Sequence, residues 1–116
     1  MKVVLLLAAG IFAFSLLSFG VAQNAYAHNN RISVSCMRDW TISCSAIATH
    51  DGLPYGGKLS WWGSGGCTPN KSTTTLAMGY GSNTFKNIAK SPCTVDVYAI
   101  FNGGHGMTNT ARTTVK

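Results

Sequence analysis

The side chains of this 116-residue chain that could carry out catalysis are few and widely spaced. The carboxylate side chains are limited to Asp39, Asp51 and Asp96, because the chain contains no glutamate. General acid–base catalysis needs a paired acid and base, whereas each aspartate lies next to a turn or in a different predicted strand. Ser64 lies in a glycine-rich turn, which lacks the strand-to-helix elbow of a nucleophilic serine. We therefore expect no enzymatic activity.

Copper binding is a second kind of chemistry to consider. Cleavage after Ala27 would leave His28 at the N-terminus, where its α-amino group and imidazole form a bidentate ligand that favours copper. His50 or His105 would complete such a site, and Met107 offers a thioether. The arrangement is similar to the N-terminal histidine sites of copper monooxygenases and periplasmic copper carriers, although no motif around the later histidines matches those families. The alternative is three solvated histidines, so we expect no cofactor and keep copper as a secondary hypothesis.

The cysteines indicate disulfides rather than a metal site. They are Cys36, Cys44, Cys67 and Cys93, separated by 8, 23 and 26 positions. A zinc site would need closely spaced CxxC pairs, which these spacings exclude. An even number of cysteines in an exported domain is typical of disulfide bonds. Four cysteines allow three connectivities.

The first 27 residues have the three parts of a secretory signal. Lys2 precedes an apolar run at residues 3–17, and Ala25 and Ala27 occupy the positions that a signal peptidase reads. Ala22 is an alternative cleavage site, and a retained membrane anchor is the alternative to cleavage. We expect a cleaved signal helix at residues 1–27 and a soluble, secreted or periplasmic domain at residues 28–116.

The charge is strongly basic. Nine Lys and Arg against three Asp give a net charge of +6, and removing Lys2 with the signal leaves +5. The basic residues are scattered, which suits either an ordinary solvated surface or attraction to anionic envelope polymers. Because the protein is expected to leave the cell, we expect no nucleic-acid partner.

The hydrophobic pattern has a period of two over nearly the whole mature chain, and no stretch has a sustained helical period. After a turn at residues 37–39, Trp40 and Ile42 are expected to begin the core-facing row of the second strand. Glycine-rich segments are expected to separate the strands, including turns at 79–82 and 102–106. The expected strands are residues 32–36, 40–48, 58–62, 72–78, 83–88, 93–101 and 107–115. About seven short strands in roughly 89 residues indicate a β-sandwich.

Two segments resemble bacterial immunoglobulin-like and PKD-like extracellular domains. Residues 51–55 (DGLPY), leading to Leu59-Ser60-Trp61, are similar to the stretch before their core tryptophan. Residues 93–99 (CTVDVYA), followed by Asn-Gly-Gly, are similar to their late strand and turn. The chain departs from the PKD pattern at residues 62–65 (WGSG), where acidic residues normally follow. The resemblance implies a small immunoglobulin-like sandwich with Trp61 in its core, and adhesion, recognition or spacing as its role.

Two disulfide schemes follow. We favour Cys36–Cys44 across the first hairpin with Cys67–Cys93 between the middle loop and the late strand. The rival is a Cys44–Cys93 bridge packed on Trp61, as in antibody-type domains. Cys93 lies early in its strand, which favours the first scheme.

An exposed aromatic surface is the main candidate binding site. If Trp61 faces the core, then Trp62 faces outward on the same strand. In an immunoglobulin-like sandwich the late strand and the last strand lie beside it. The candidate ligand-binding residues are Trp62, Tyr98, Ile100 and Arg112. The alternatives are a loop that covers Trp62, or a register that exchanges the two tryptophans.

We therefore predict a monomeric, secreted, non-catalytic recognition module that binds an extracellular glycan, a cell-envelope polymer or a protein through this aromatic surface. A secreted antagonist is the first alternative, either a cationic antibacterial protein or an inhibitor of an extracellular enzyme. Its contact would be the loop at residues 51–57. Copper binding through His28 is the second.

Overall fold

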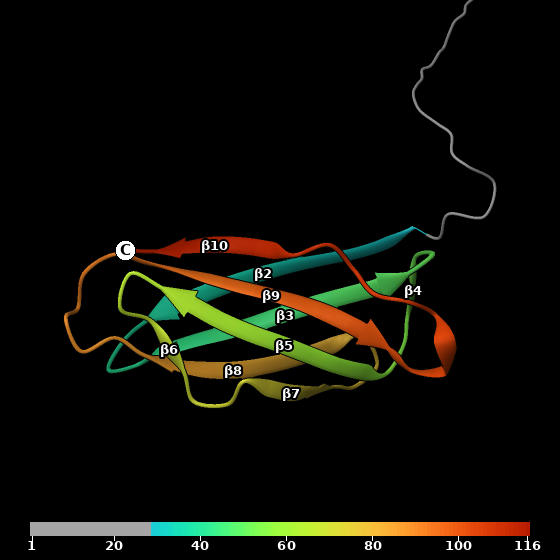
Figure 1. Cartoon of the computed structure of the whole chain (residues 1–116), viewed down its shortest axis with the longest axis horizontal. Helices are drawn as coiled ribbons and strands as arrows, with labels where there is room; N and C mark the ends of the chain where they lie inside the picture. The colour runs from blue at the N-terminus through green and yellow to red at the C-terminus, as the bar shows by residue number, and fades with distance from the viewer. Residues whose placement is uncertain (1–28) are drawn as a thin grey trace, which may run out of the picture.

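The computed structural model describes residues 29–116, which form a two-layer sandwich of β-sheets (Figure 1). The predicted signal helix, its cleavage site and His28 lie outside the described residues. The strands are β2 (Asn30–Arg38), β3 (Ile42–His50), β4 (Leu53–Pro54), β5 (Gly57–Ser64), β6 (Thr68–Pro69), β7 (Thr73–Leu76), β8 (Tyr80–Lys86), β9 (Cys93–Phe101) and β10 (Ala111–Val115). The single helical segment within 29–116 is the 3-10 turn η2 (Asn102–Gly104).

The two sheets have the strand order of an immunoglobulin-type sandwich. One sheet has the order β10-β9-β5-β7, and the other has the order β2-β3-β8-β6, with β4 paired to β3. All neighbouring strands are antiparallel. The orders β10-β9-β5 and β2-β3-β8 correspond to the G-F-C and A-B-E strands of the immunoglobulin fold. The predicted fold class, a small immunoglobulin-like β-sandwich with two disulfides, is confirmed.

The core lies between the sheets and follows the alternation of the strands. In β9 the inward positions Val95, Val97 and Ala99 are each 0% exposed. Trp61 is 2% exposed, lies edge-to-face against Phe85 with ring centroids 6.0 Å apart, and donates its indole N–H to the Thr74 hydroxyl at 2.7 Å. A buried indole needs such an acceptor. Trp61 is therefore the core tryptophan, as predicted, and the exchanged register is excluded.

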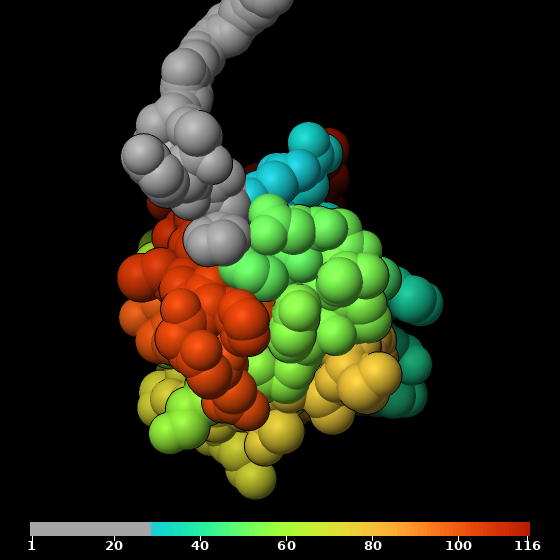
Figure 2. All heavy atoms as spheres, turned by 90° about the vertical axis from the view of Figure 1, so that its right-hand side faces the viewer, coloured from blue at the N-terminus to red at the C-terminus, as the bar shows by residue number. Residues whose placement is uncertain are grey.

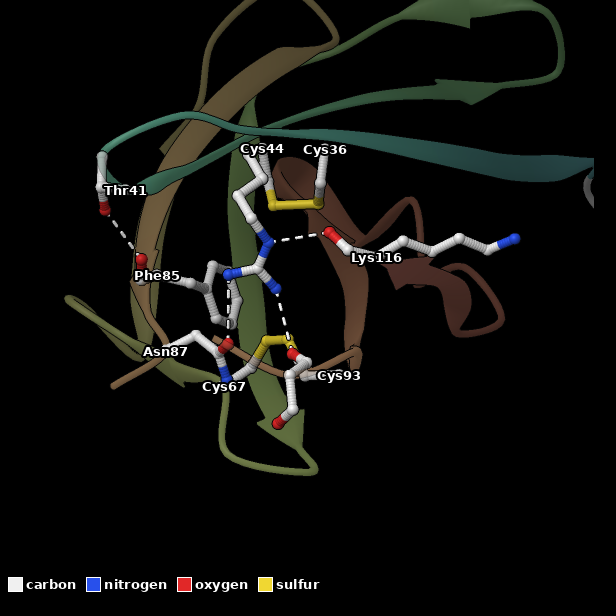
Figure 3. Close-up of a disulfide and its surroundings, with 10 residues drawn as sticks. Cys36, Thr41, Cys44, Cys67, Phe85, Asn87, Cys93 and Lys116 are labelled. Carbon is white, nitrogen blue, oxygen red and sulfur yellow. Dashed lines mark hydrogen bonds between the residues drawn. A yellow bond between two sulfur atoms is a disulfide. The ribbon is translucent and has the colours of Figure 1, made fainter. Parts of the chain in front are cut away.

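Both disulfides of the favoured scheme are present. Cys36–Cys44 joins directly opposed residues of β2 and β3. Cys67–Cys93 connects the residue before β6 to the first residue of β9, and so joins the two sheets. The two bridges lie near each other at one end of the sandwich, with Phe85 beside them (Figure 3). The rival Cys44–Cys93 bridge is wrong.

The first turn lies further along the chain than predicted. Met37 belongs to β2, and the turn consists of residues 39–41, closed by a hydrogen bond from the Asp39 N–H to the Thr41 carbonyl at 2.8 Å. The register that opposes Arg38 to Ile42 leaves Trp40 in the turn, where it is 97% exposed. The expectation that Trp40 begins the core row is therefore wrong.

The turn predicted at residues 79–82 is also displaced. Ala77 and Tyr80 form both backbone hydrogen bonds of a tight hairpin, and Met78 and Gly79 have φ of 50° and 79°. Positive φ at both central residues is typical of a type I′ turn. Gly81 lies inside β8, where an added Cβ would stand 2.4 Å from the Leu59 Cδ1 atom, so this glycine serves packing rather than turning.

The last strand begins later than predicted, at Ala111 rather than Met107. Met107 makes only an isolated bridge with Ile100. The Thr108 hydroxyl accepts a hydrogen bond from the Ala99 N–H at 2.9 Å, and the Thr108 N–H donates to the Ala99 carbonyl. The Thr108 side chain thus takes the place of a backbone acceptor opposite Ala99. The regular pairing with β9 is therefore interrupted before β10 begins.

Candidate functional site

The four predicted binding residues lie together on the outer face of the β10-β9-β5-β7 sheet. Trp62 in β5 is 42% exposed and Ile100 in β9 is 44% exposed, while Arg112 is exposed and Tyr98 is half-buried. Trp62 and Arg112 both pair with Asp96, one from each side of β9. We call the surface formed by Trp62, Tyr98, Ile100, Arg112 and Asp96 the aromatic face.

The centre of the aromatic face is a pair of rings. Trp62 and Tyr98 lie edge-to-face, with ring centroids 5.8 Å apart and planes at 66°. They are diagonal neighbours, because Trp62 opposes Asp96 and Tyr98 opposes Ser60. No described loop covers Trp62, since a large part of its surface is open. Two neighbouring strands thus hold an exposed aromatic pair in a defined arrangement.

A buried carboxylate lies beside these rings and holds Arg112. The Asp96 side chain is 3% exposed, whereas that of Arg112 is 71% exposed. Arg112 donates from Nε to Asp96 Oδ1 at 2.8 Å and from Nη2 to Oδ2 at 3.2 Å. The hydrogen bond with Asp96 and the charge of that carboxylate raise the pKa of Arg112. The pair fixes the guanidinium against the sheet and balances its charge locally.

Hydroxyl groups, which are not among the predicted binding residues, surround the aromatic face. In β5, Ser60 lies between Tyr98 and Thr73, and Lys58 lies between Ile100 and Thr75. Thr94 pairs with both Ser64 and Thr114. Alternation within each strand indicates the face of each residue, but only the register shows which of them are neighbours.

Asp96 also belongs to this site, although it is not among the predicted binding residues. The period-two pattern places it on the same side of β9 as Tyr98, and that signal was available. Its partner Arg112 is 16 positions away, and their contact depends on the pairing of β9 with β10. Asp96 therefore positions Arg112, a role that composition and spacing do not reveal.

Of the candidate copper ligands, His50, His105 and Met107 lie within the described residues, and His28 does not. Figure 2 shows the end of the sandwich where residues 102–106 meet residues 50–57. His50 is 4% exposed, and its Nδ1 lies 2.6 Å from the Asn30 side-chain oxygen. The His50 and His105 rings are 4.6 Å apart, and Met107 is 55% exposed. Within residues 29–116 there is no group of three or more His, Cys, Asp or Glu side chains that could hold a metal ion.

The three aspartates occupy separate places. Asp39 precedes β3 and Asp51 follows it, and the nine residues of this strand span about 30 Å. Asp96 is engaged by Arg112. At these positions Asp39 and Asp51 are too far apart to act together as a catalytic pair. The absence of enzymatic activity stays a prediction.

Comparison with protein-family models, curated proteins and solved structures finds no match to this chain. Membership of the bacterial immunoglobulin-like or PKD-like families therefore stays a prediction. The two disulfides are typical of an oxidising compartment. Among residues 29–116, no helix has the length and apolar character needed to cross a membrane.

Proposed function

We propose that this protein is a non-catalytic recognition module that binds an extracellular or cell-envelope glycan through its aromatic face. The observation that carries the proposal is the exposed Trp62–Tyr98 pair, held on two adjacent strands and surrounded by hydroxyl groups. Aromatic rings bind the apolar faces of sugar rings, while neighbouring polar groups bind the sugar hydroxyls.

The electrostatics of the aromatic face favour a neutral sugar over an acidic one. Arg112 presents N–H groups to solvent, but the Asp96 carboxylate offsets its charge. Lys58 adds a positive charge at the edge of the face, beside Ile100. The ligand is therefore recognised mainly by stacking and hydrogen bonds, and its binding should depend weakly on salt.

A glycan array and a pull-down with purified cell-wall polymers test this proposal. Trp62→Ala should lower binding about tenfold or more, because truncating a central aromatic residue removes the main contact. Trp40→Ala is the matched control, since Trp40 is equally a surface tryptophan but lies in the β2–β3 turn. The control should bind like the unchanged protein.

The result that would overturn the proposal is glycan binding that survives both Trp62→Ala and Tyr98→Ala in variants with unchanged melting curves. Equal loss in Trp40→Ala would also contradict it. Bacterial killing or enzyme inhibition that persists in Trp62→Ala would favour the antagonist alternative instead.

A further inference from the structure

The end of the sandwich next to the disulfides presents a second surface, separate from the aromatic face. It consists of the β2–β3 turn at residues 39–41 and the β8–β9 loop at residues 87–92. Both loops lie at the same end of the sandwich in Figure 1, where the teal and orange connections turn back. Residues of both loops line a single depression of about 470 Å³. We call these two loops the tip.

The tip holds the two most exposed large apolar side chains among residues 29–116. Trp40 is 97% exposed and Ile88 is 92% exposed, and both line the depression. Isolated exposed apolar residues are common on soluble proteins and need no explanation. Two of them brought together from different loops, 48 positions apart in the chain, indicate a surface that is covered by a partner.

The charges around these side chains are predominantly positive. The depression is lined by three cations, Arg38, Lys86 and Lys90, and by one anion, Asp39. An exposed tryptophan and a neighbouring aliphatic side chain flanked by lysines are typical of protein surfaces at the membrane–water interface. The lysines complement anionic headgroups, and the apolar side chains enter the boundary of the acyl chains.

Hydrogen bonds hold the tip in place before any partner binds. Arg38 donates to the Asn87 side-chain oxygen at 3.1 Å, to the Ser91 carbonyl at 3.1 Å and to the Lys116 carbonyl at 2.8 Å, bonds drawn as dashed lines in Figure 3. The Thr41 hydroxyl donates to the Phe85 carbonyl at 2.8 Å. Since both loops are anchored, docking would cost little conformational entropy.

We propose that the tip docks on a lipid bilayer that contains anionic phospholipid, with Trp40 and Ile88 inserted at the interface and Lys86 and Lys90 on the headgroups. The tip lies at one end of the strands, while the aromatic face runs along their side. A docked molecule would therefore leave the aromatic face open. This surface is independent of the proposed glycan site, and either proposal can fail alone.

Tryptophan fluorescence with lipid vesicles tests the proposal on the purified secreted protein. A Trp62→Phe background leaves Trp40 as the exposed tryptophan, because Trp61 is buried. Adding vesicles of phosphatidylcholine and phosphatidylglycerol should shift the Trp40 emission to shorter wavelength, and lipids brominated on their acyl chains should quench it. Vesicles of phosphatidylcholine alone should give a much weaker response.

Variants separate the contribution of the lysines to vesicle binding from that of the apolar side chains. In co-sedimentation, Lys86→Gln with Lys90→Gln should weaken binding to the anionic vesicles roughly 30-fold. Trp40→Ala with Ile88→Ala should weaken it about tenfold or more. The matched control is Lys58→Gln, which removes a lysine at the edge of the aromatic face and should leave vesicle binding unchanged. All variants carry the same N-terminal segment, so differences between them report on the tip.

An unchanged Trp40 spectrum with anionic vesicles would overturn the proposal, and a tip that instead binds a protein would give that result. An equal response to both vesicle types, unaffected by the lysine substitutions, would also overturn it. Because the spectrum reports on Trp40 itself, membrane binding through another part of the chain cannot produce the expected result.

Discussion

The aromatic face and the tip both expose a tryptophan, but they hold it in opposite ways. Trp62 lies on a paired strand against Tyr98, next to the buried Asp96, whose two oxygens are both hydrogen-bonded. Trp40 lies in a turn, and among residues 29–116 it makes no ring contact. In the β8–β9 loop, which is the other loop of the tip, the Asn87 Nδ2 atom is buried without a hydrogen-bond partner in the described residues.

This difference indicates what kind of partner each surface suits. A face built on paired strands keeps its side chains in register, which suits a ligand of defined shape. The tip depends on a few anchoring bonds and on the cross-links behind it, and its apolar side chains have few neighbours to orient them. Such a surface suits a fluid partner that adapts to it, as a bilayer does.

The largest loss of stability is expected for Trp61, the core residue next to Trp62 of the aromatic face. Trp61→Ala should lower the free energy of unfolding by roughly 3–5 kcal/mol, because it leaves a cavity beside Phe85. The adjacent Trp62→Ala should cost less than about 1 kcal/mol, because that side chain is 42% exposed. Urea denaturation of both variants measures the difference. Equal losses would mean that the aromatic face is part of the core and not a free surface.

The next largest loss of stability is expected when a disulfide is removed, and both disulfides lie behind the tip. Under the loop-entropy model, loss of Cys67–Cys93, which closes 26 positions, should cost about 3.5 kcal/mol, and loss of Cys36–Cys44, which closes 8, about 2.5 kcal/mol. Paired Cys→Ala variants and thermal denaturation measure both values. If loss of Cys36–Cys44 lowers the free energy of unfolding more than loss of Cys67–Cys93 does, then the anchoring of the tip does not depend mainly on the bridge between the sheets.

A smaller loss of stability than for either disulfide is expected for Arg38→Ala, which removes three hydrogen bonds to the segments around the tip. We expect a loss of about 2 kcal/mol and faster amide exchange at residues 87–92, with glycan binding unchanged. Arg31→Ala is the control, because Arg31 lies on the same strand and bonds only to the neighbouring Asn29 side chain in the described residues. Slow exchange that persists in Arg38→Ala would show that the tip is rigid without this anchor.

Much of the architecture could be predicted from alternation. The bounds of β9, the inward side of Trp61, the outward side of Trp62 and the pairing of the cysteines all agree with the structure. Errors occurred where a contact between distant segments decides the conformation. Gly81 was assigned to a turn because glycine usually marks one, but it lies in a strand because Leu59 occupies the space beside it.

The sequence by itself determined the sandwich, because a period of two places alternate side chains on opposite sides of any extended strand. It also determined which residues of β5 and β9 face outward. Only the tertiary structure decided that Asp96 holds Arg112, and that Trp40 and Ile88 share one depression. The reason is that register and loop placement depend on pairing between segments far apart in the chain, which no local pattern records.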